Sequence, residues 1–123
     1  MRDESQTNDM RLPDGEHLRV DREKIVDYLL SATHPDGQTK AEFFRRFGFR
    51  QDRWRVLAEA LRKQGRSRPI VKAVESPHGT RYSVDGPIES PDGRHPQIRT
   101  VWILEDGGRS PRLITAHPLE VPE

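Results

Sequence analysis

Hydrophobic residues change their spacing near Gly65, and this change constrains the fold more than any other feature of the chain. Before Gly65 they recur every three or four residues, as on the buried face of an α-helix. After it they occur in short runs separated by turn-forming residues, as in strands joined by tight turns. Helices followed by consecutive strands predict an α+β domain. We expect two to three N-terminal helices packed on one face of a four-stranded antiparallel meander sheet, with the other face free.

Three segments have the spacing and the end signals of helices. They cover residues 21–31, 40–47 and 51–64. Asp21 is a good N-cap for the first helix, and Gly65 is expected just beyond the end of the third. The buried faces of the first and third helices are expected to consist of Ile25, Val26, Leu29 and Leu30, and of Trp54, Leu57, Ala58 and Leu61.

Four later segments have the composition and alternation of half-buried strands. They cover residues 70–74, 80–84, 98–104 and 112–116, and short turns rich in Gly, Pro and Asp connect them. A brief extended run is also expected at 17–20. The whole domain is expected to span residues 12–119, between a flexible tail at 1–11 and a short tail at 120–123.

The connection between the first two predicted helices brings a histidine and a lysine together. Residues 35–37, Pro-Asp-Gly, predict a tight turn, because proline fixes its own φ and glycine adopts the positive φ that such turns require. Thr39 and Glu42 have the spacing of a capping box. His34 and Lys40 then flank a helix N-terminus. Two interpretations remain open: an anion site, with phosphate as the candidate ligand, or a well-capped connection with two solvated polar side chains.

The net charge of +1 conceals a basic middle of the chain. Residues 40–68 contain ten Lys or Arg and three Asp or Glu, a local balance of +7, whereas both ends are acidic by comparison. Such a distribution fits a nucleic-acid contact surface, and it fits solvated arginine-rich helix faces equally well. If RNA is the partner, the candidate contacts are Arg45, Arg46, Arg50 and Arg53.

Several classes of site and location are excluded or disfavoured. The absence of cysteine excludes disulfides, thiolate metal sites and thiol nucleophiles, and it fits a reducing cytoplasm. No apolar run is long enough for a membrane span or a signal-peptide core, so we expect a cytoplasmic protein without membrane contact. The five histidines lack zinc-site spacing, and no phosphate loop or Rossmann fingerprint occurs. We therefore expect no metal and no other cofactor.

Several motifs occur in a fixed order along the chain. They are the run from His34 to Phe44, Gly79-Thr80-Arg81-Tyr82, Pro91-Asp92-Gly93-Arg94, Thr100-Val101-Trp102 and the run from Pro111 to Pro118. Together they resemble a bacterial domain family of unknown function, whose members are small stand-alone proteins or C-terminal modules of polymorphic toxins. The resemblance extends over about residues 12–119. The layout is also similar to that of the barnase, EndoU, colicin and RelE group of metal-independent ribonucleases. One difference is His117, where the family more often has tyrosine.

The ribonuclease resemblance favours an enzyme and implies its site residues. RNA cleavage without metal needs a base for the 2′-hydroxyl proton, cations for the phosphorane charge and an acid for the leaving oxygen. We expect His34 as base or acid and His117 as the second proton-transfer group. The residues expected to hold the phosphate are Lys40, Arg81 and Arg94, and Thr100 or Thr115 is expected to hydrogen-bond a non-bridging oxygen. The implied product is a 2′,3′-cyclic phosphate, the substrate is tRNA or mRNA, and a cognate antitoxin or immunity protein restrains the toxin.

The alternative is a non-catalytic binding module. Such a module would use the basic middle of the chain to contact nucleic acid or an acidic protein. Composition and spacing alone fit both interpretations, because function depends on sites rather than on fold class.

Overall fold

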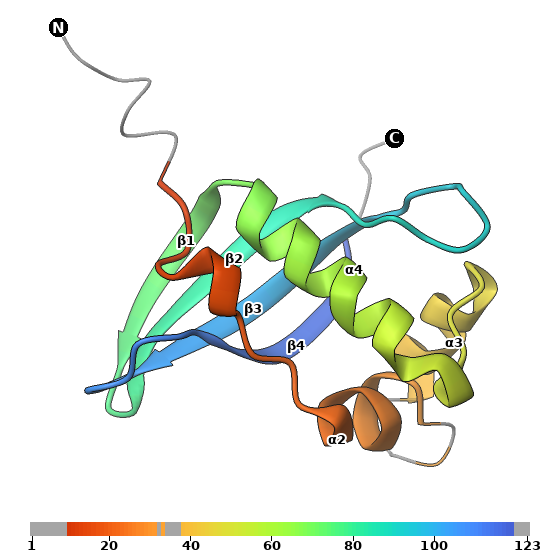
Figure 1. The fold of residues 1–123 in the computed structure, drawn as a ribbon, viewed down its shortest axis with the longest axis horizontal. Helices are drawn as coiled ribbons and strands as arrows, with labels where there is room; N and C mark the ends of the chain where they lie inside the picture. Colours follow the sequence, from red (N-terminus) through yellow and green to blue (C-terminus); the bar gives the residue numbers. More distant parts are fainter. Residues whose placement is uncertain (1–9, 32, 34–37, 120–123) are drawn as a thin grey trace, which may run out of the picture.

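The computed structural model describes residues 10–31, 33 and 38–119. Residues 1–9 and 120–123 of the predicted tails lie outside this range, and so do residues 34–37, which include His34 and the predicted Pro-Asp-Gly turn. Helices come first along the chain and four strands follow (Figure 1). The predicted α+β class is therefore confirmed.

The N-terminal half forms helices with bounds close to those predicted. The first comprises α2 (Arg22–Lys24) and a π-helical continuation, η2 (Ile25–Leu29). The second is α3 (Gln38–Arg46). A short 3-10 turn, η3 (Gln51–Arg53), leads into the longest helix, α4 (Trp54–Ser67). Within the described residues, none of these helices has both the length and the apolar character needed to cross a membrane.

The four strands form one antiparallel sheet in the order β1-β2-β3-β4, as predicted for a meander. They are β1 (Ile70–Ser76), β2 (Gly79–Pro87), β3 (Gln97–Glu105) and β4 (Arg112–Pro118). Each strand extends slightly beyond its predicted range. The turn-forming residues between the predicted strands therefore predicted the positions of the hairpins correctly.

A bulge interrupts β4 where it pairs with β3. Trp102 pairs with Leu113, but the preceding residue of β3 pairs with Thr115, so Ile114 is the extra residue. Leu113 and Ala116 are both buried on the helix-covered face, although they are three positions apart along the strand. The bulge thus changes the alternation of β4 just before Thr115.

The segment before α2 covers part of the outer edge of β4. It contains an unpredicted 3-10 turn, η1 (Gly15–His17), followed by a parallel bridge between Arg19 and Arg112. Two backbone hydrogen bonds of 2.9 Å join Arg19 to the β4 side. The extended run predicted at 17–20 is therefore confirmed at Arg19 but not at His17, which belongs to the turn.

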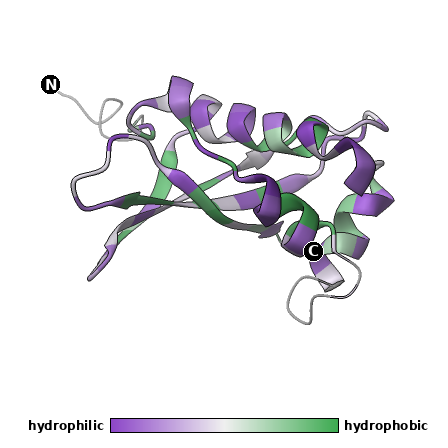
Figure 2. Ribbon diagram, turned by 60° about the horizontal axis from the view of Figure 1, so that its bottom comes forward, coloured by the Kyte–Doolittle hydropathy of each residue, from purple (hydrophilic) through white to green (hydrophobic). Residues whose placement is uncertain are grey.

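The helices cover one face of the sheet. α4 lies across it, and α2 and α3 gather near the N-terminal end of α4 (Figure 1). The fully buried side chains between the layers include Leu57 and Leu61 of α4, and Val84, Ile98 and Trp102 of the sheet. Hydrophilic residues follow the outer side of α4, and hydrophobic stretches occur in the strands beneath it (Figure 2). This distribution matches the amphipathic pattern read from the sequence.

Gly65 does not end the last helix, contrary to our prediction, because α4 continues to Ser67. Gly65 is buried, and a Cβ atom at this position would lie 2.6 Å from Cζ2 of Trp102 and 3.1 Å from Cδ1 of Leu18. Real Cβ atoms essentially never lie as close to another heavy atom as 2.6 Å. The glycine therefore allows α4 to pack directly on Trp102, and its role is close packing rather than helix termination.

A polar network is buried between α4 and the sheet. Trp102 Nε1 donates to Thr100 Oγ1 at 2.7 Å, and Thr100 Oγ1 donates to Gln64 Oε1 at 2.7 Å. Gln64 Nε2 in turn donates to the carbonyl oxygens of Val84 at 3.0 Å and Ile98 at 3.2 Å. Thr100 and Trp102 are 0% exposed, and Gln64 is 3% exposed. These bonds satisfy buried polar groups and fix the position of α4 over β2 and β3.

Candidate active site at the edge of β4

Two lysines and two hydroxyl groups meet where the first helix, α3 and β4 come together. The Tyr28 hydroxyl lies 3.2 Å from Thr115 Oγ1, within hydrogen-bond distance. Lys24 Nζ lies 5.2 Å from the centroid of the Tyr28 ring, and Lys40 Nζ lies 5.5 Å from it. We call these four residues, Lys24, Tyr28, Lys40 and Thr115, the lysine–tyrosine cluster. It gathers cations and hydroxyl groups from three parts of the chain at one place.

The local structure explains how each member of this cluster is positioned. Lys24 and Tyr28 are four residues apart, so they lie on the same side of the first helix. Lys40 is in the first turn of α3. Thr115 follows the bulge of β4, which is an edge strand, so its hydroxyl group is accessible to a side chain of the helical layer.

The two lysines are held near the phenol ring by cation–π contacts rather than by carboxylates. Ammonium-to-centroid distances below about 6 Å are typical of such contacts. Among the described residues, no Asp or Glu forms an ion pair with Lys24 or Lys40. The positive charge of the cluster is therefore not neutralised by a described side chain, which favours an anionic ligand.

His117 lies two residues beyond Thr115 on β4, roughly 7 Å away between Cα atoms. It is half-buried and pairs with Arg99 of β3, and its Nδ1 is 3.2 Å from the Pro118 carbonyl oxygen. Arg99 donates two hydrogen bonds to Asp85, at 2.6 and 2.9 Å. These bonds raise the pKa of the Arg99 guanidinium, despite the opposing effect of burial. The cation beside His117 is thus paired, while His117 is close enough to Thr115 to serve the same site.

The structure brings together Lys40, Thr115 and His117 from the predicted catalytic set, and it places Thr100 and Arg81 elsewhere. Thr100 is completely buried in the Gln64 network, on the face covered by α4. Arg81 is exposed on β2, where it pairs with Ile103 of β3. Two strand spacings, roughly 10 Å, therefore separate Arg81 from β4. His34 lies outside the described residues.

Arg94 also lies apart from the cluster, because it holds the β2–β3 loop against α3. Its Nη2 donates to the Arg46 carbonyl oxygen at 2.8 Å, and its Nε donates to Asp92 Oδ2 at 2.6 Å. The guanidinium is 4.4 Å from the centroid of the Phe47 ring. Arg46 and Phe47 are at the C-terminal end of α3, about two helical turns from Lys40. These contacts give Arg94 a structural role.

The carboxyl group of Asp92 organises the same loop, and this predicts a local effect of acid. The Arg94 backbone N–H donates to Asp92 Oδ1 at 3.0 Å and Ser90 Oγ donates to it at 2.7 Å. The backbone bond is the largest cause that lowers the pKa of Asp92 from 3.8 to about 2. The stabilisation is therefore present above pH 3.8 and is lost as the pH falls toward about 2. We expect the urea midpoint of Asp92→Asn to fall less steeply than that of the wild type as the pH is lowered through this interval.

An exposed carboxylate in another turn provides the control for this prediction. Asp106→Asn changes a side chain that forms no hydrogen bond or ion pair with the described residues, so its urea midpoint should follow that of the wild type. Identical pH profiles for Asp92→Asn and the wild type would contradict the prediction.

The four arginines predicted to bind RNA differ in their contacts. Arg45 Nη2 donates to a carbonyl oxygen at the end of the first helix, at 2.7 Å, and Arg50 forms two hydrogen bonds with Asp52, at 3.0 and 2.9 Å. The side chains of Arg46 and Arg53 are exposed and have no such partner among the described residues. Arg45 and Arg50 line an open groove of about 540 Å³. A charge count could not distinguish the arginines with internal partners from the others.

Lys24 and Tyr28 were not predicted as site residues. Their spacing of four residues was visible in the sequence, but the exposed side of a single helix does not show which elements it faces. Only the packing of α3 and β4 beside the first helix brings Lys40 and Thr115 to Tyr28. A lysine and a tyrosine at positions i and i+4 were the signal that could have identified them.

The chemical groups of this site are ammonium, hydroxyl and imidazole groups. Across the described ranges, no three or more His, Asp or Glu side chains lie together in a way that could hold a metal ion. The groups present are suited to charge stabilisation and proton transfer.

Comparison with known proteins identifies a family and a similar fold. The profile of the family described as "Domain of unknown function (DUF6883)" matches residues 11–120. A chain of the solved structure described as "Contact-dependent growth inhibition toxin - immunity protein complex from Klebsiella pneumoniae 342" has a similar fold, with a TM-score of 0.68 and 23% sequence identity. The similarity covers 87% of this chain and 97% of that chain. No curated protein matches the chain.

Proposed function

The chain belongs to the DUF6883 family of domains of unknown function. From the geometry of the candidate site, we propose that it is a metal-independent ribonuclease toxin. In the proposed reaction the 2′-hydroxyl oxygen of RNA attacks the adjacent phosphorus, and the bond from phosphorus to the 5′-oxygen breaks. The products are a 2′,3′-cyclic phosphate end and a 5′-hydroxyl end. The proposed active site consists of the lysine–tyrosine cluster and His117, with His34 as a further proton-transfer group.

Each group of the proposed site has a role in this reaction. The ammonium groups of Lys24 and Lys40 stabilise the charge that develops on the non-bridging oxygens, and the hydroxyl groups of Tyr28 and Thr115 donate hydrogen bonds to the same oxygens. His117 transfers a proton to or from the reacting oxygens, because imidazole changes its charge near neutral pH. One proton leaves the 2′-hydroxyl group and one reaches the 5′-oxygen, so the protons balance.

One observation carries this proposal: two ammonium groups, neither paired with a carboxylate of the described residues, lie beside the ring of Tyr28, whose hydroxyl group is 3.2 Å from that of Thr115. Three separate parts of the chain contribute to it, so it is a product of the tertiary fold. A site that only solvates charge would not need two hydroxyl groups beside the cations. Phosphate is the anion that such an arrangement recognises, through both its charge and its several acceptor oxygens.

The similar fold of a chain from a toxin–immunity complex supports a place in a toxin system. The proposed partner is accordingly a cognate immunity or antitoxin protein that covers the active site. The proposed substrate is tRNA or mRNA in the cytoplasm of the target cell. The exposed side chains of Arg46 and Arg53 are candidates for contacts with the RNA backbone.

The proposed function can be tested by the products of RNA cleavage. Purified protein is incubated with total bacterial RNA in EDTA, and the new ends are identified by mass spectrometry. We expect discrete cleavage with 2′,3′-cyclic phosphate ends, reduced by Tyr28→Phe, Thr115→Val and His117→Ala. Thr80→Val provides a control on β2, outside the cluster. In parallel, the protein is expressed in bacteria with and without its genetic neighbour.

Four outcomes would contradict the proposal. Products with 3′-hydroxyl ends, or activity that EDTA abolishes, would exclude the proposed mechanism. Intact RNA together with harmless expression of the wild type would favour the alternative, a non-catalytic binding module that contacts nucleic acid or an acidic protein. Protection of cells from another toxin would assign the chain an immunity role instead.

A further inference from the structure

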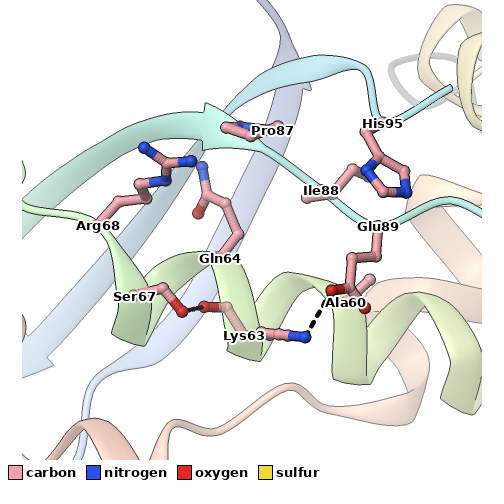
Figure 3. A pocket seen from close by; sticks show the side chains of 9 residues that line it. All are labelled: Ala60, Lys63, Gln64, Ser67, Arg68, Pro87, Ile88, Glu89 and His95. Carbon is pink, nitrogen blue, oxygen red and sulfur yellow. Dashed lines mark hydrogen bonds and ion pairs between the residues drawn. The ribbon is translucent and has the colours of Figure 1, made fainter.

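A separate pocket of about 250 Å³ lies between the last turns of α4 and the end of β2 (Figure 3). Ala60, Pro87 and Ile88 provide its apolar surface, and its charged or titratable side chains are Lys63, Arg68, Glu89 and His95. None of these residues belongs to the lysine–tyrosine cluster. The volume is just below the range of about 300–1,000 Å³ that holds drug-sized ligands, so the pocket fits a single small unit.

Arg68 and His95 lie at opposite ends of this pocket (Figure 3). The stem of Arg68 packs over Gly86, where a Cβ atom would lie 2.9 Å from Cγ and 3.1 Å from Nε of the arginine. The glycine thus leaves room for the arginine over the strand. Within the described part of the chain, the Arg68 guanidinium forms no hydrogen bond or ion pair. This end of the pocket therefore offers a positioned cation whose fork matches a phosphate group.

The other end of the pocket offers a ring and a carboxylate. His95 has a φ of 53°, in the left-handed region that non-glycine residues seldom occupy. The backbone N–H of His95 donates to Ser90 Oγ at 3.1 Å. Glu89 Oε2 accepts a hydrogen bond from Lys63 Nζ at 2.5 Å, and this bond lowers the pKa of Glu89. Glu89 Oε1 accepts no hydrogen bond from the described residues. A planar ligand can stack on the imidazole and donate to this oxygen.

We infer that this pocket binds a ribonucleotide unit, with its phosphate on Arg68, its sugar over Ile88 and its base against His95 and Glu89. The two ends of the pocket differ in chemistry, so the ligand must have an anionic end and a planar end that carries N–H donors. A nucleotide has both. The unit is either a free mononucleotide or one nucleotide of an RNA strand, and the second source rests on the proposed function.

Calorimetric titration of the full chain tests this inference with 5′-AMP, adenosine and inorganic phosphate as probes. We expect 5′-AMP to bind more tightly than either of its parts. Arg68→Ala should weaken binding at least about tenfold, because it removes charge-assisted hydrogen bonds. Gly86→Ala keeps the guanidinium but displaces it, so it should also weaken binding. Arg66→Ala is the matched control, since Arg66 is exposed on α4, lies outside the pocket and contacts Glu59 at 3.4 Å.

The inference is overturned if 5′-AMP does not bind, if phosphate binds as tightly as 5′-AMP, or if Arg68→Ala binds 5′-AMP like the wild type. Circular dichroism verifies that each variant is folded. 5′-AMP contains no phosphodiester bond, so this result is independent of whether the chain cleaves RNA. If RNA cleavage occurs, a raised KM in Arg68→Ala identifies the RNA strand as the source of the nucleotide. An unchanged KM with weakened 5′-AMP binding identifies a free mononucleotide.

Discussion

Replacing Thr100 by valine is expected to lower the free energy of unfolding by about 2–6 kcal/mol. The hydroxyl group accepts from Trp102 Nε1 and donates to Gln64 Oε1, both at 2.7 Å and both in the core. Valine has nearly the same shape, so the substitution leaves an indole N–H and an amide oxygen buried without these partners. Each buried polar group left unsatisfied costs about 1–3 kcal/mol. Urea denaturation of both proteins measures the difference.

Thr80→Val is the matched control for this experiment. Thr80 is half-buried on β2, and its hydroxyl group makes no hydrogen bond with the described residues, so the same substitution should change stability by about 0.5 kcal/mol or less. Equal stability of Thr100→Val and the wild type would show that the buried network is not needed to hold α4 on the sheet.

The second large effect is expected for the lysines of the cluster. Lys24→Met and Lys40→Met should each lower kcat/KM for RNA cleavage by about 10²–10³-fold, as seen when one group that stabilises transition-state charge is removed. Methionine retains an apolar stem of similar length but removes the ammonium group. Because an exposed cation–π contact contributes about 0.5–1 kcal/mol, both variants should remain folded. Cleavage of a fluorescent oligoribonucleotide measures the change in kcat/KM, and urea denaturation of the same variants measures any change in stability.

Lys72→Met provides the control for charge, since Lys72 is exposed on β1 and lies outside the cluster. Its expected effect on kcat/KM is small and should disappear as salt is raised. If Lys40→Met and Lys24→Met cleave RNA as fast as Lys72→Met, the lysine–tyrosine cluster is not the active site, even if the chain is a ribonuclease.

Much of the fold could be predicted from the sequence because the periodic patterns reflect burial directly. Ile25, Leu29, Leu57 and Leu61 were expected on buried helix faces, and all four are fully buried. The four strands and their order were also predicted, because short turns between consecutive strands leave few topologies other than a meander.

Features that depend on contacts between distant parts of the chain could not be predicted in this way. The role of Gly65 depends on Trp102, which lies 37 positions later in the chain, and a glycine near a helix end is usually a stop signal. The contact of Tyr28 with Thr115 depends on the same kind of long-range packing. Helical periodicity indicates which side of a helix is buried, but not which residue meets it.

The contacts of polar residues in the candidate site, too, could be predicted only in part from the sequence. Lys40, Thr115 and His117 were chosen from the sequence and lie near one another, whereas Thr100, Arg81 and Arg94 lie apart from them. Polar residues in strands can face either side of a sheet, and the free face could not be identified before the pairing register was known. Arg94 was chosen for its charge, but its backbone and ring contacts assign it to the loop.

Because of the bulge in β4, the number of residues in this strand matters as much for the site as the identity of their side chains. In an uninterrupted strand, side chains three positions apart point to opposite faces, yet Leu113 and Ala116 both face the core. Ile114 is therefore one extra residue between two segments of β4, each of which has a side chain buried in the core. We therefore expect the site to tolerate exchange of the Ile114 side chain more readily than loss of the residue itself. A deletion here would turn Leu113 or Ala116 toward solvent and carry the Thr115 hydroxyl away from Tyr28.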